Sequence, residues 1–175
     1  GVRVIWLKGE TDMLGALEEV ESFGEFAKRN NVVASTEVKS FEHLICTEQL
    51  SRRLGFKVGE ELIRVVRVRS LNGNARQVDH GYFLESIAKG LTPEIAAKSI
   101  YDYLEHKRGV KVMASRRTVS VELANDEDCS YLDLGKYNCV AVMESQSYTS
   151  DGILFEVTHA RTHPEIFHYR VNSKR

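Results

Sequence analysis

The sequence of 175 residues has no excess of charge of either sign, because its 24 lysines and arginines are matched by 25 aspartates and glutamates. The net charge of −1 goes with an isoelectric point near 6.7. A domain that grips nucleic acid by itself usually carries a basic excess, with an isoelectric point often above ~9. The chain by itself therefore gives no electrostatic reason to contact DNA.

Cysteines are few, and long apolar runs are missing. Cys46, Cys129 and Cys139 are odd in number and form no CxxC pair, which fits reduced thiols in a cytosolic protein. No apolar run approaches the ~18 residues that a membrane span needs, and no signal-peptide pattern opens the chain. We therefore expect a cytoplasmic protein with no membrane partner.

The sequence also lacks the common signatures of catalysis, since it has no GxSxG, HExxH or glycine-rich phosphate loop. His159, His163 and His168 invite a metal hypothesis. On a strand, however, His159 and His163 would lie about 13 Å apart, too far to share one ion without a bend. We expect no metal, no cofactor and no catalytic residue.

What is present predicts a single domain. With 42% hydrophobic residues the chain can bury a core. Tight turns between consecutive strands require antiparallel pairing, and the helices come in blocks between the strands. This pattern predicts an α+β fold, a mainly antiparallel sheet with helices packed on one face. The predicted strands cover 1–5, 32–45, 61–71, 75–83, 110–124, 137–149, 153–162 and 168–172; the predicted helices cover 16–31, 47–55, 91–109 and 125–135; and 6–15 is a predicted linker.

Two arginines stand out in the strand that contains RVVRVR. Arg67 and Arg69 lie two residues apart, so they share one face of the strand with Val65. Neighbouring guanidinium groups repel each other unless an anion lies between them, and arginine suits two-point recognition of phosphate or carboxylate. The alternative is a solvated face on which the two arginines pair with carboxylates across the sheet.

The turn after this strand decides what lies opposite the arginines. A two-residue turn at 72–73 would place Arg67 across from Val78, whereas a three-residue loop over 72–74 would place it across from Asp79. The second register gathers Arg67, Arg69, Gln77 and Asp79 on one face. Such a face is poor core and suits the lining of a site.

Helix starts add further candidates. Ser99 and Tyr101 lie where one helix ends or kinks and another begins, and a hydroxyl with free N–H groups can seat a phosphate there; the alternative is that Ser99 only caps the next turn. Ser22, at or near another helix start, could add a hydroxyl beside Phe23. Glu156 lies mid-strand, where it either pairs with an arginine or accepts hydrogen bonds from the hydroxyls of a polar ligand.

These fragments, in this order, resemble the effector-binding domain of the HutC subfamily of GntR transcription regulators. This domain, also called the UTRA domain, shares its fold with chorismate lyase. The resemblance runs from about Ser22 to Arg170. Residues 1–5 resemble the last strand of a winged helix-turn-helix, so 1–15 would be a remnant of that wing strand and its linker, and 16–175 the UTRA domain. The matching fragments are SF (22–23), LG…G (54–59), RVRSLNGNARQVD (67–79), KSIYDYLE (98–105), DLGKYNCVAVMES (133–145) and SDGILFEVTHAR (150–161).

The resemblance implies a domain that binds a small anionic metabolite, often a sugar phosphate, and so alters how a homodimer holds its DNA-binding heads on an operator. DNA would be contacted only through an N-terminal domain absent from this chain. The phosphate would be bound by Arg67, Arg69, Ser99, Tyr101, Ser22 and Phe23, and the remainder of the ligand by Asp79 and Glu156.

Two departures from the family pattern leave the sugar open. Asp79 is commonly glutamate in relatives, and an aromatic residue often follows Glu156 where this chain has Thr162 and His163. The segment LTPEIAAKSIYDYLE is similar to trehalose-operon repressors, which makes trehalose 6-phosphate one candidate effector. The resemblance also predicts that replacing either arginine by alanine weakens effector binding at least tenfold and leaves the fold intact. The alternatives are a chorismate lyase-like enzyme acting on a carboxylated substrate, and a dimerisation module with a vestigial pocket.

Overall fold

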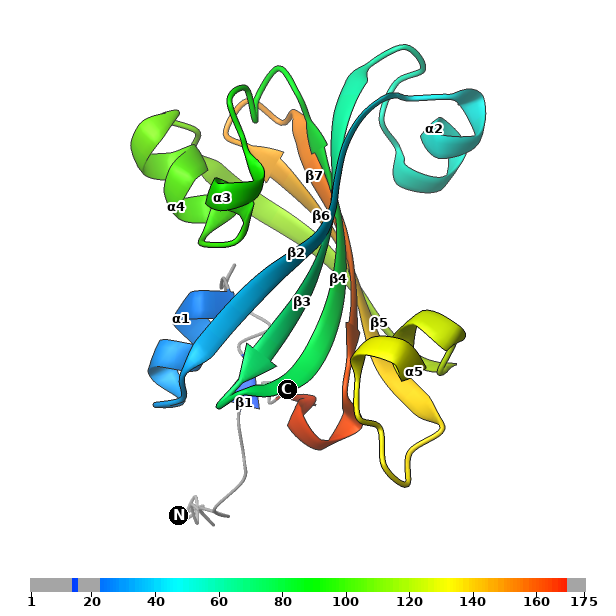
Figure 1. Ribbon diagram of the computed structural model, residues 1–175. Helices are drawn as coiled ribbons and strands as arrows, with labels where there is room; N and C mark the ends of the chain where they lie inside the picture. Colours follow the sequence, from blue (N-terminus) through cyan, green and yellow to red (C-terminus); the bar gives the residue numbers. More distant parts are fainter. Residues whose placement is uncertain (1–13, 16–22, 170–175) are drawn as a thin grey trace, which may run out of the picture.

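The computed structural model describes residues 14–15 and 23–169 of the chain, and a six-stranded sheet forms its centre (Figure 1). Every neighbouring pair in this sheet is antiparallel, so the predicted α+β class is confirmed. In spatial order the strands are β2 (Ala34–Ile45), β3 (Glu61–Leu71), β4 (Asn74–Leu84), β7 (Leu154–Thr162), β6 (Cys139–Thr149) and β5 (Val112–Leu123).

A second, two-stranded sheet pairs β1 (Leu14–Gly15) with β8 (His168–Tyr169) in parallel. Residues 14–15 were predicted to be linker, and their pairing with a strand far along the sequence is a correction. The predicted strand over 1–5 and the part of the predicted helix over 16–22 lie outside the described residues, as does the end of the predicted strand over 168–172.

Short helical segments connect the strands, and several of the predicted caps are confirmed. The hydroxyl of Thr47 accepts a hydrogen bond from the Leu50 N–H at 3.3 Å, and Gly55 ends that helix with φ of 89°. The segments are α1 (Phe23–Arg29), α2 (Glu48–Leu54), α3 (Pro93–Ala96), α4 (Ile100–Asp102), η1 (Tyr103–Lys107), α5 (Asp126–Tyr131) and η2 (Pro164–Ile166).

The helical segment predicted over 91–109 is divided at Ser99, and the prediction that one helix ends there and another begins is confirmed. Thr92 and Pro93 begin a helix as expected, but Ser99 adopts an extended backbone, with φ of −112° and ψ of 111°, which interrupts it. The Ser99 hydroxyl then accepts a hydrogen bond from the Asp102 N–H at 3.2 Å and caps a new turn. The segment therefore folds as consecutive short turns.

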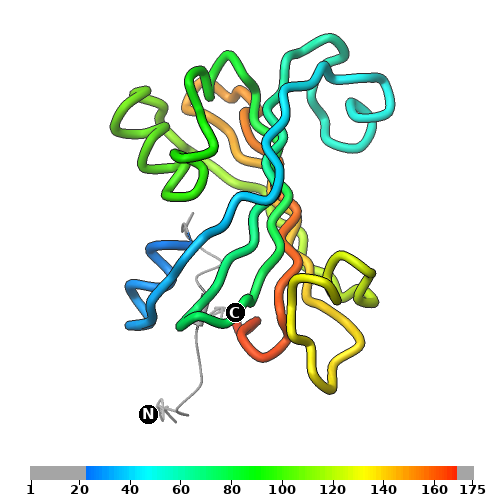
Figure 2. Tube along the Cα trace, in the orientation of Figure 1, coloured from blue at the N-terminus to red at the C-terminus, as the bar shows by residue number. Residues whose placement is uncertain are grey.

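Helices lie on both faces of the sheet, and the prediction of one covered face needs this correction. Figure 2 shows the strands twisting across one another at the centre, with helical segments grouped at four corners. The reason is that β3 is apolar on both sides: Val65 and Val66, which point to opposite faces, are both buried. Val65 belongs to the buried cluster that includes Ile100 of α4, whereas Val66 packs in the cluster that includes Leu132, directly after α5.

The β3–β4 hairpin combines the turn of one predicted register with the residue pairing of the other. The turn has two residues, Asn72 and Gly73, and both have the positive φ (49° and 81°) that a type I′ turn requires. Arg76 is then left without a partner in the ladder, since Arg69 pairs with Gln77 while Ser70 pairs with Ala75. This bulge shifts the register by one residue. The predicted three-residue loop is therefore wrong, but its consequence, Asp79 opposite Arg67, is confirmed.

A buried ion pair fastens α5 to the sheet on the face opposite Arg67. Arg161 of β7 donates to both carboxylate oxygens of Asp128, with its Nε at 2.9 and 3.0 Å. Asp128 is fully buried, and its hydrogen bonds to Arg161 raise the pKa of the guanidinium. The sequence analysis did not identify this pair.

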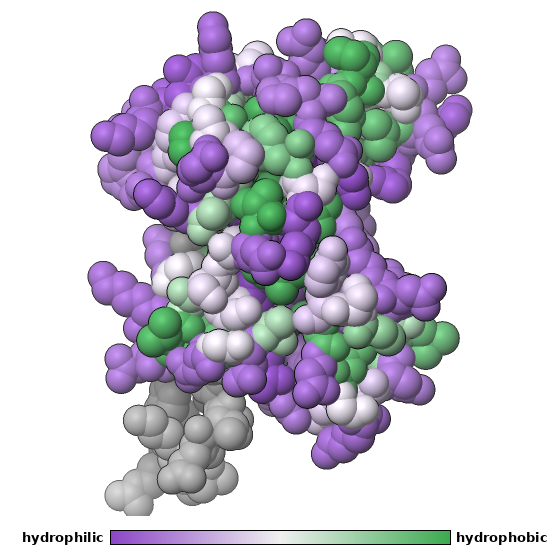
Figure 3. All heavy atoms as spheres, in the orientation of Figure 1, coloured by the Kyte–Doolittle hydropathy of each residue, from purple (hydrophilic) through white to green (hydrophobic). Residues whose placement is uncertain are grey.

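On the face drawn in Figure 3, charged and polar side chains predominate and apolar side chains gather in separate patches. Among the helices in residues 23–169, none has the length and apolar character that crossing a bilayer requires.

Candidate functional site

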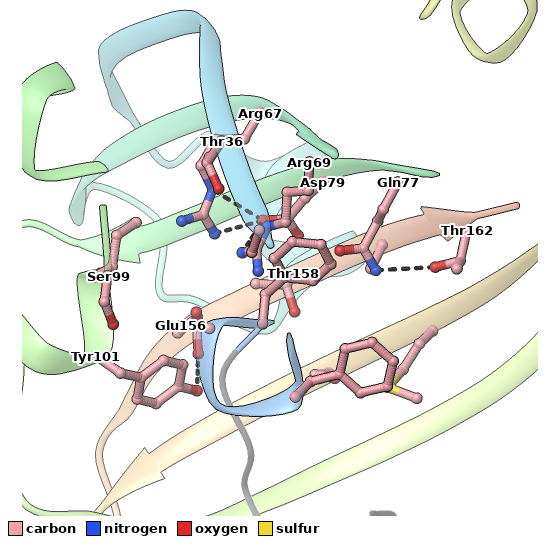
Figure 4. A pocket seen from close by; sticks show the side chains of 18 of the residues that line it. Thr36, Arg67, Arg69, Gln77, Asp79, Ser99, Tyr101, Glu156, Thr158 and Thr162 are labelled. Carbon is pink, nitrogen blue, oxygen red and sulfur yellow. Dashed lines mark hydrogen bonds and ion pairs between the residues drawn. The ribbon is translucent and has the colours of Figure 1, made fainter. Parts of the chain in front are cut away.

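A cavity of ≈ 360 Å³ lies between α1, the α3–α4 segment and the face of the sheet that carries Arg67. All six strands of the large sheet contribute to its wall. Seven of the eight predicted site residues line it, and the eighth, Ser22, lies outside the described residues. The seven are Phe23 and, labelled in Figure 4, Arg67, Arg69, Asp79, Ser99, Tyr101 and Glu156.

Asp79 holds both arginines at one end of the cavity. Its Oδ2 accepts hydrogen bonds from Arg67 Nε at 3.0 Å and from Arg69 at 2.8 Å. The pairing with a carboxylate across the sheet, one of the two hypotheses for these arginines, is therefore present, but it is buried: Arg67 is 4% and Asp79 2% exposed. Two guanidinium groups share one carboxylate, so this end of the cavity carries a net positive charge.

The charges around Asp79 set its ionisation. Burial alone would raise the pKa of its carboxyl group, but the positive charges of Arg69 and Arg67 and their hydrogen bonds outweigh burial and lower it to about 2. Asp79 is therefore ionised throughout the physiological range. Arg67 is additionally fixed by a hydrogen bond of 3.4 Å to the carbonyl oxygen of Ala96 in α3.

Arg69 is less completely satisfied than Arg67. Its Nε is buried and has no hydrogen-bond partner within the described part of the chain. Its guanidinium carbon lies 5.0 Å from the centre of the Phe23 ring of α1. Burial, followed by the nearby charge of Arg67, lowers the pKa of Arg69. A buried donor without an acceptor costs about 1–3 kcal/mol, so this group favours the arrival of an acceptor.

The other end of the cavity is rich in hydroxyl groups. The Tyr101 hydroxyl donates a hydrogen bond to Glu156, and it lies 3.0 Å from the hydroxyl of Ser147 (Figure 4). Burial raises the pKa of Glu156, although the hydrogen bonds of Tyr101 and Ser147 with its carboxyl group act in the opposite direction. Burial and the charge of Glu156 raise the pKa of Tyr101, so its hydroxyl stays protonated. Thr36, Ser145 and Thr158 add further hydroxyls to the wall.

Glu156→Gln is expected to change how stability depends on pH. Because the folded-state pKa of Glu156 is raised, its contribution to the free energy of unfolding is fully present below the ordinary glutamate pKa and is lost as pH rises through the folded value. Urea unfolding at a series of pH values from 4 to 8 should show this loss in the parent chain and not in the variant. If the free energy of unfolding depended on pH in the same way in the two proteins, ionisation of Glu156 would not destabilise the fold.

Ser99 lies at the cavity wall, but its hydroxyl oxygen already caps α4 through the Asp102 N–H. The capping hypothesis for Ser99 therefore holds. The hydroxyl hydrogen remains available as a donor. Because α4 is only three residues long, its start offers few free N–H groups for a phosphate.

One wall of the cavity, formed by β5 and β6, was not predicted. Ser115, Arg117, Ser145 and Ser147 point into it. The Ser115 hydroxyl is buried and, like Arg69 Nε, has no partner among the described residues. The sequence pattern that could have revealed this wall is the polar residues at alternate positions of two neighbouring strands, because alternate residues of a strand lie on the same face. On the neighbouring strands, Gln77 donates a hydrogen bond of 2.9 Å to Thr162.

The histidines do not form a metal site. His159 lies on the opposite face of the sheet from the cavity, and the buried His163 contacts the carbonyl oxygen of Asp133 at 3.1 Å. Across the described ranges, no three His, Cys, Asp or Glu side chains are placed to hold a metal ion.

Comparisons with known proteins agree with this fold. The model of the family described as the UTRA domain matches residues 29–168. The HTH-type transcriptional regulator TreR of Bacillus subtilis (strain 168) is 28% identical over 148 residues, which cover 85% of this chain and 62% of TreR. The chain therefore spans about three fifths of the length of this curated relative.

Solved structures give the same result. The effector binding domain of the B. subtilis trehalose repressor (TreR) superposes with a TM-score of 0.72 at 27% identity, covering 81% of this chain and 98% of that one. A GntR-family transcriptional regulator from Bacillus cereus gives a TM-score of 0.70 at 23% identity, covering 81% of this chain and 99% of that one. The family match spans most of the residues, and the fold agrees over the 81% of the chain that these structures cover: the chain belongs to the UTRA family, the ligand-binding domains of GntR-family transcriptional regulators.

Proposed function

We propose that this chain is the ligand-sensing domain of a cytoplasmic bacterial transcriptional repressor, and that the cavity beside Arg69 binds a small anionic metabolite of the sugar-phosphate class. One observation carries the proposal. A buried, unpartnered guanidinium N–H lies at the positive end of a cavity whose other end is lined with hydroxyl groups. An anion at Arg69 and a polyol towards Tyr101 would satisfy both ends.

The size and chemistry of the cavity support this ligand class. At ≈ 360 Å³ the cavity falls in the range of ~300–1,000 Å³ that is usual for small-molecule sites. The arginines offer charge-assisted hydrogen bonds of roughly 1.5–3 kcal/mol each to an oxyanion. The similarity to the effector binding domain of the trehalose repressor makes trehalose 6-phosphate one candidate effector.

The link from effector to DNA would run through α1. Phe23 of this helix covers the Arg69 guanidinium, so an anion that draws Arg69 into the cavity would also change the contact with α1. In the proposed full-length homodimer, residues 1–15 connect this domain to an N-terminal winged helix-turn-helix that holds the operator. Effector binding would then alter the spacing of the two DNA-binding heads.

The proposal can be tested by measuring the Tm of the chain with a panel of phosphorylated and unphosphorylated sugars. A true effector at 100 times its Kd adds about 2.7 kcal/mol of stability. For a domain of this size that corresponds to a rise in Tm of about 5–10 °C. The matched unphosphorylated sugar should give a much smaller shift.

Two outcomes would contradict the proposal. If no phosphorylated compound shifts the Tm, the pocket does not bind an anionic sugar. The alternative of a dimerisation module with a vestigial pocket would then be favoured. If the chain instead turns over chorismate, the lyase-like enzyme is the better description. Chorismate turnover is followed by the loss of its absorbance in the same protein preparation.

A further inference from the structure

A second cavity, of ≈ 400 Å³, lies on the face of the sheet opposite the candidate site. Figure 1 shows α2 and α5 on the side of the strands away from α1, α3 and α4, and residues of α2 and α5 line this cavity. Leu54 and Val157 are the aliphatic members of its wall, and its other lining side chains are polar or charged. Its volume falls in the range of ~300–1,000 Å³ that is usual for small-molecule sites.

Two rows of side chains, which run across the strands, form the floor of this second cavity. In one row, Tyr82 of β4 lies opposite Val157 of β7. In the next row, His159 of β7 lies between His80 of β4 and Glu144 of β6. Because the rows are two residues apart on each strand, they are separated by about 7 Å. Burial lowers the pKa of His159, so its imidazole is neutral at pH 7 and adds no charge to the floor.

Two of the charged groups in the wall are already held by neighbouring side chains. Arg161 donates a hydrogen bond of 2.9 Å to Asp128, as described above. Glu127 of α5 lies 2.8 Å from the Nε2 atom of His80. These groups fix α5 against the sheet and shape the cavity, so we look to the remaining charges for the recognition of a ligand.

The remaining charges have opposite signs and lie at different rows of the floor. Arg53 of α2 donates a hydrogen bond of 2.8 Å to the Tyr82 hydroxyl, which places its guanidinium group at the first row. Arg64 lies opposite Tyr82 and adds a second guanidinium there, although it also lies 3.3 Å from Glu42. Glu144 brings a carboxylate to the other row. Within the described residues, neither Arg53 nor Glu144 forms an ion pair.

From this separation of charge we infer that the second cavity binds a zwitterionic small molecule of the ω-amino acid class. The carboxylate of the ligand lies at Arg53, because a guanidinium group offers two parallel N–H donors to a carboxylate. The ammonium group lies at Glu144, and the methylene chain crosses the floor between the two rows. A chain of about four methylene groups spans the distance of about 7 Å between the rows.

Other charge patterns suit the cavity less well. A dicarboxylate would place one of its anionic groups beside Glu144, and a diamine would place one of its cationic groups beside Arg53. Either ligand would meet a like charge at one end of the cavity, which is unfavourable. The inference does not rest on the proposed function, because no residue lines both cavities.

Ligand-observed NMR titration of the parent chain with 5-aminopentanoate tests the inference. Pentanoate lacks the amino group and pentylamine lacks the acid group, so they are the matched ligands. We expect each of them to bind at least tenfold more weakly than 5-aminopentanoate, because each loses one charge-assisted contact. The inference is wrong if 4-aminobutanoate, 5-aminopentanoate and 6-aminohexanoate all fail to bind, or if pentanoate binds as tightly as 5-aminopentanoate.

Two neighbouring arginines of α2 provide a matched pair of variants. Arg52 and Arg53 are both exposed, but only Arg53 lines the second cavity. We expect Arg53→Gln to weaken the binding of 5-aminopentanoate at least tenfold, and Arg52→Gln to leave it within twofold of the parent. Equal weakening by the two substitutions would overturn the inference, because it would reflect the general loss of positive charge.

Glu144→Gln tests the other end of the second cavity. It should weaken the binding of 5-aminopentanoate at least tenfold, whereas Glu61→Gln, at an exposed glutamate of β3 that lines neither cavity, should not. Unchanged affinity in Glu144→Gln would also overturn the inference. The sugar-phosphate panel concerns the cavity on the other face of the sheet, so the two proposals fail separately.

Discussion

Asp79→Ala is expected to lower the free energy of unfolding by about 3–5 kcal/mol, because removing one partner of a buried ion pair leaves an uncompensated buried charge. Here the loss concerns two charges. Arg67 and Arg69 both donate to Asp79 Oδ2, and Arg67 is only 4% exposed. Without the carboxylate, the two guanidinium groups would repel each other in a site that water reaches poorly.

Urea unfolding at pH 7 measures this loss. Glu37→Ala is the control, because Glu37 forms an exposed ion pair with Lys39 at 2.6 Å, and exposed pairs are worth about 0–1 kcal/mol. A loss at Asp79 no larger than at Glu37 would show that the arginines find other partners. Acid titration adds a second readout. Since the pKa of Asp79 is lowered from 3.8 to about 2, its stabilisation is present above pH 4 and is lost as pH falls towards 2. Asp79→Asn should lack that component.

Local patterns were sufficient to predict the six strands of the large sheet, several helix caps and the face on which the site lies. Alternation placed Arg67 and Arg69 together, and the caps at Thr47, Gly55 and Thr92 follow from side-chain chemistry within four residues. These features depend on short-range rules that act identically in any fold. This explains why the candidate residues on β3, β4 and β7 do meet in one cavity.

Features that depend on distant partners were not predictable in this way. The bulge at Arg76 corrects the register that a two-residue turn alone would give, and no local pattern marks it. The ion pair between Arg161 and Asp128 joins residues 33 positions apart. Likewise, Ser115 lines the cavity because β5 and β6 extend the same sheet on the side away from β3, which carries Arg69. This strand order could not be read from local sequence patterns.

Arg67 and Arg69 of β3 have different roles, and this changes what their substitution should do. The sequence led us to expect that either could be replaced without harm to the fold. The structure instead shows Arg67 buried between Asp79 and the carbonyl of Ala96, so Arg67→Ala should destabilise the domain by several kcal/mol, about 3–5. Its effect on effector binding cannot then be separated from its effect on folding.

Arg69→Ala is the informative substitution. It removes an Nε–H that has no partner among the described residues, but it also removes the 2.8 Å hydrogen bond from Arg69 to Asp79 and the contact with Phe23. Because Asp79 stays paired with Arg67, the free energy of unfolding should fall by only about 1–3 kcal/mol, and the domain should remain folded. Binding of a sugar phosphate, by contrast, should weaken about 10- to 150-fold, which corresponds to the ~1.5–3 kcal/mol of a charge-assisted hydrogen bond. Isothermal titration with trehalose 6-phosphate, or with whichever phosphorylated sugar raises the Tm most, measures it.

Two further variants make this result specific to the geometry of Arg69. Arg69→Lys keeps the positive charge but has no planar fork, so its affinity should fall between that of the parent chain and that of Arg69→Ala. Arg116→Ala removes an exposed arginine of β5 that does not line the cavity, and it should bind the sugar phosphate as the parent does. Equal affinities for Arg69→Ala and Arg116→Ala would mean that the anion binds elsewhere, because long-range charge alone does not distinguish the two positions.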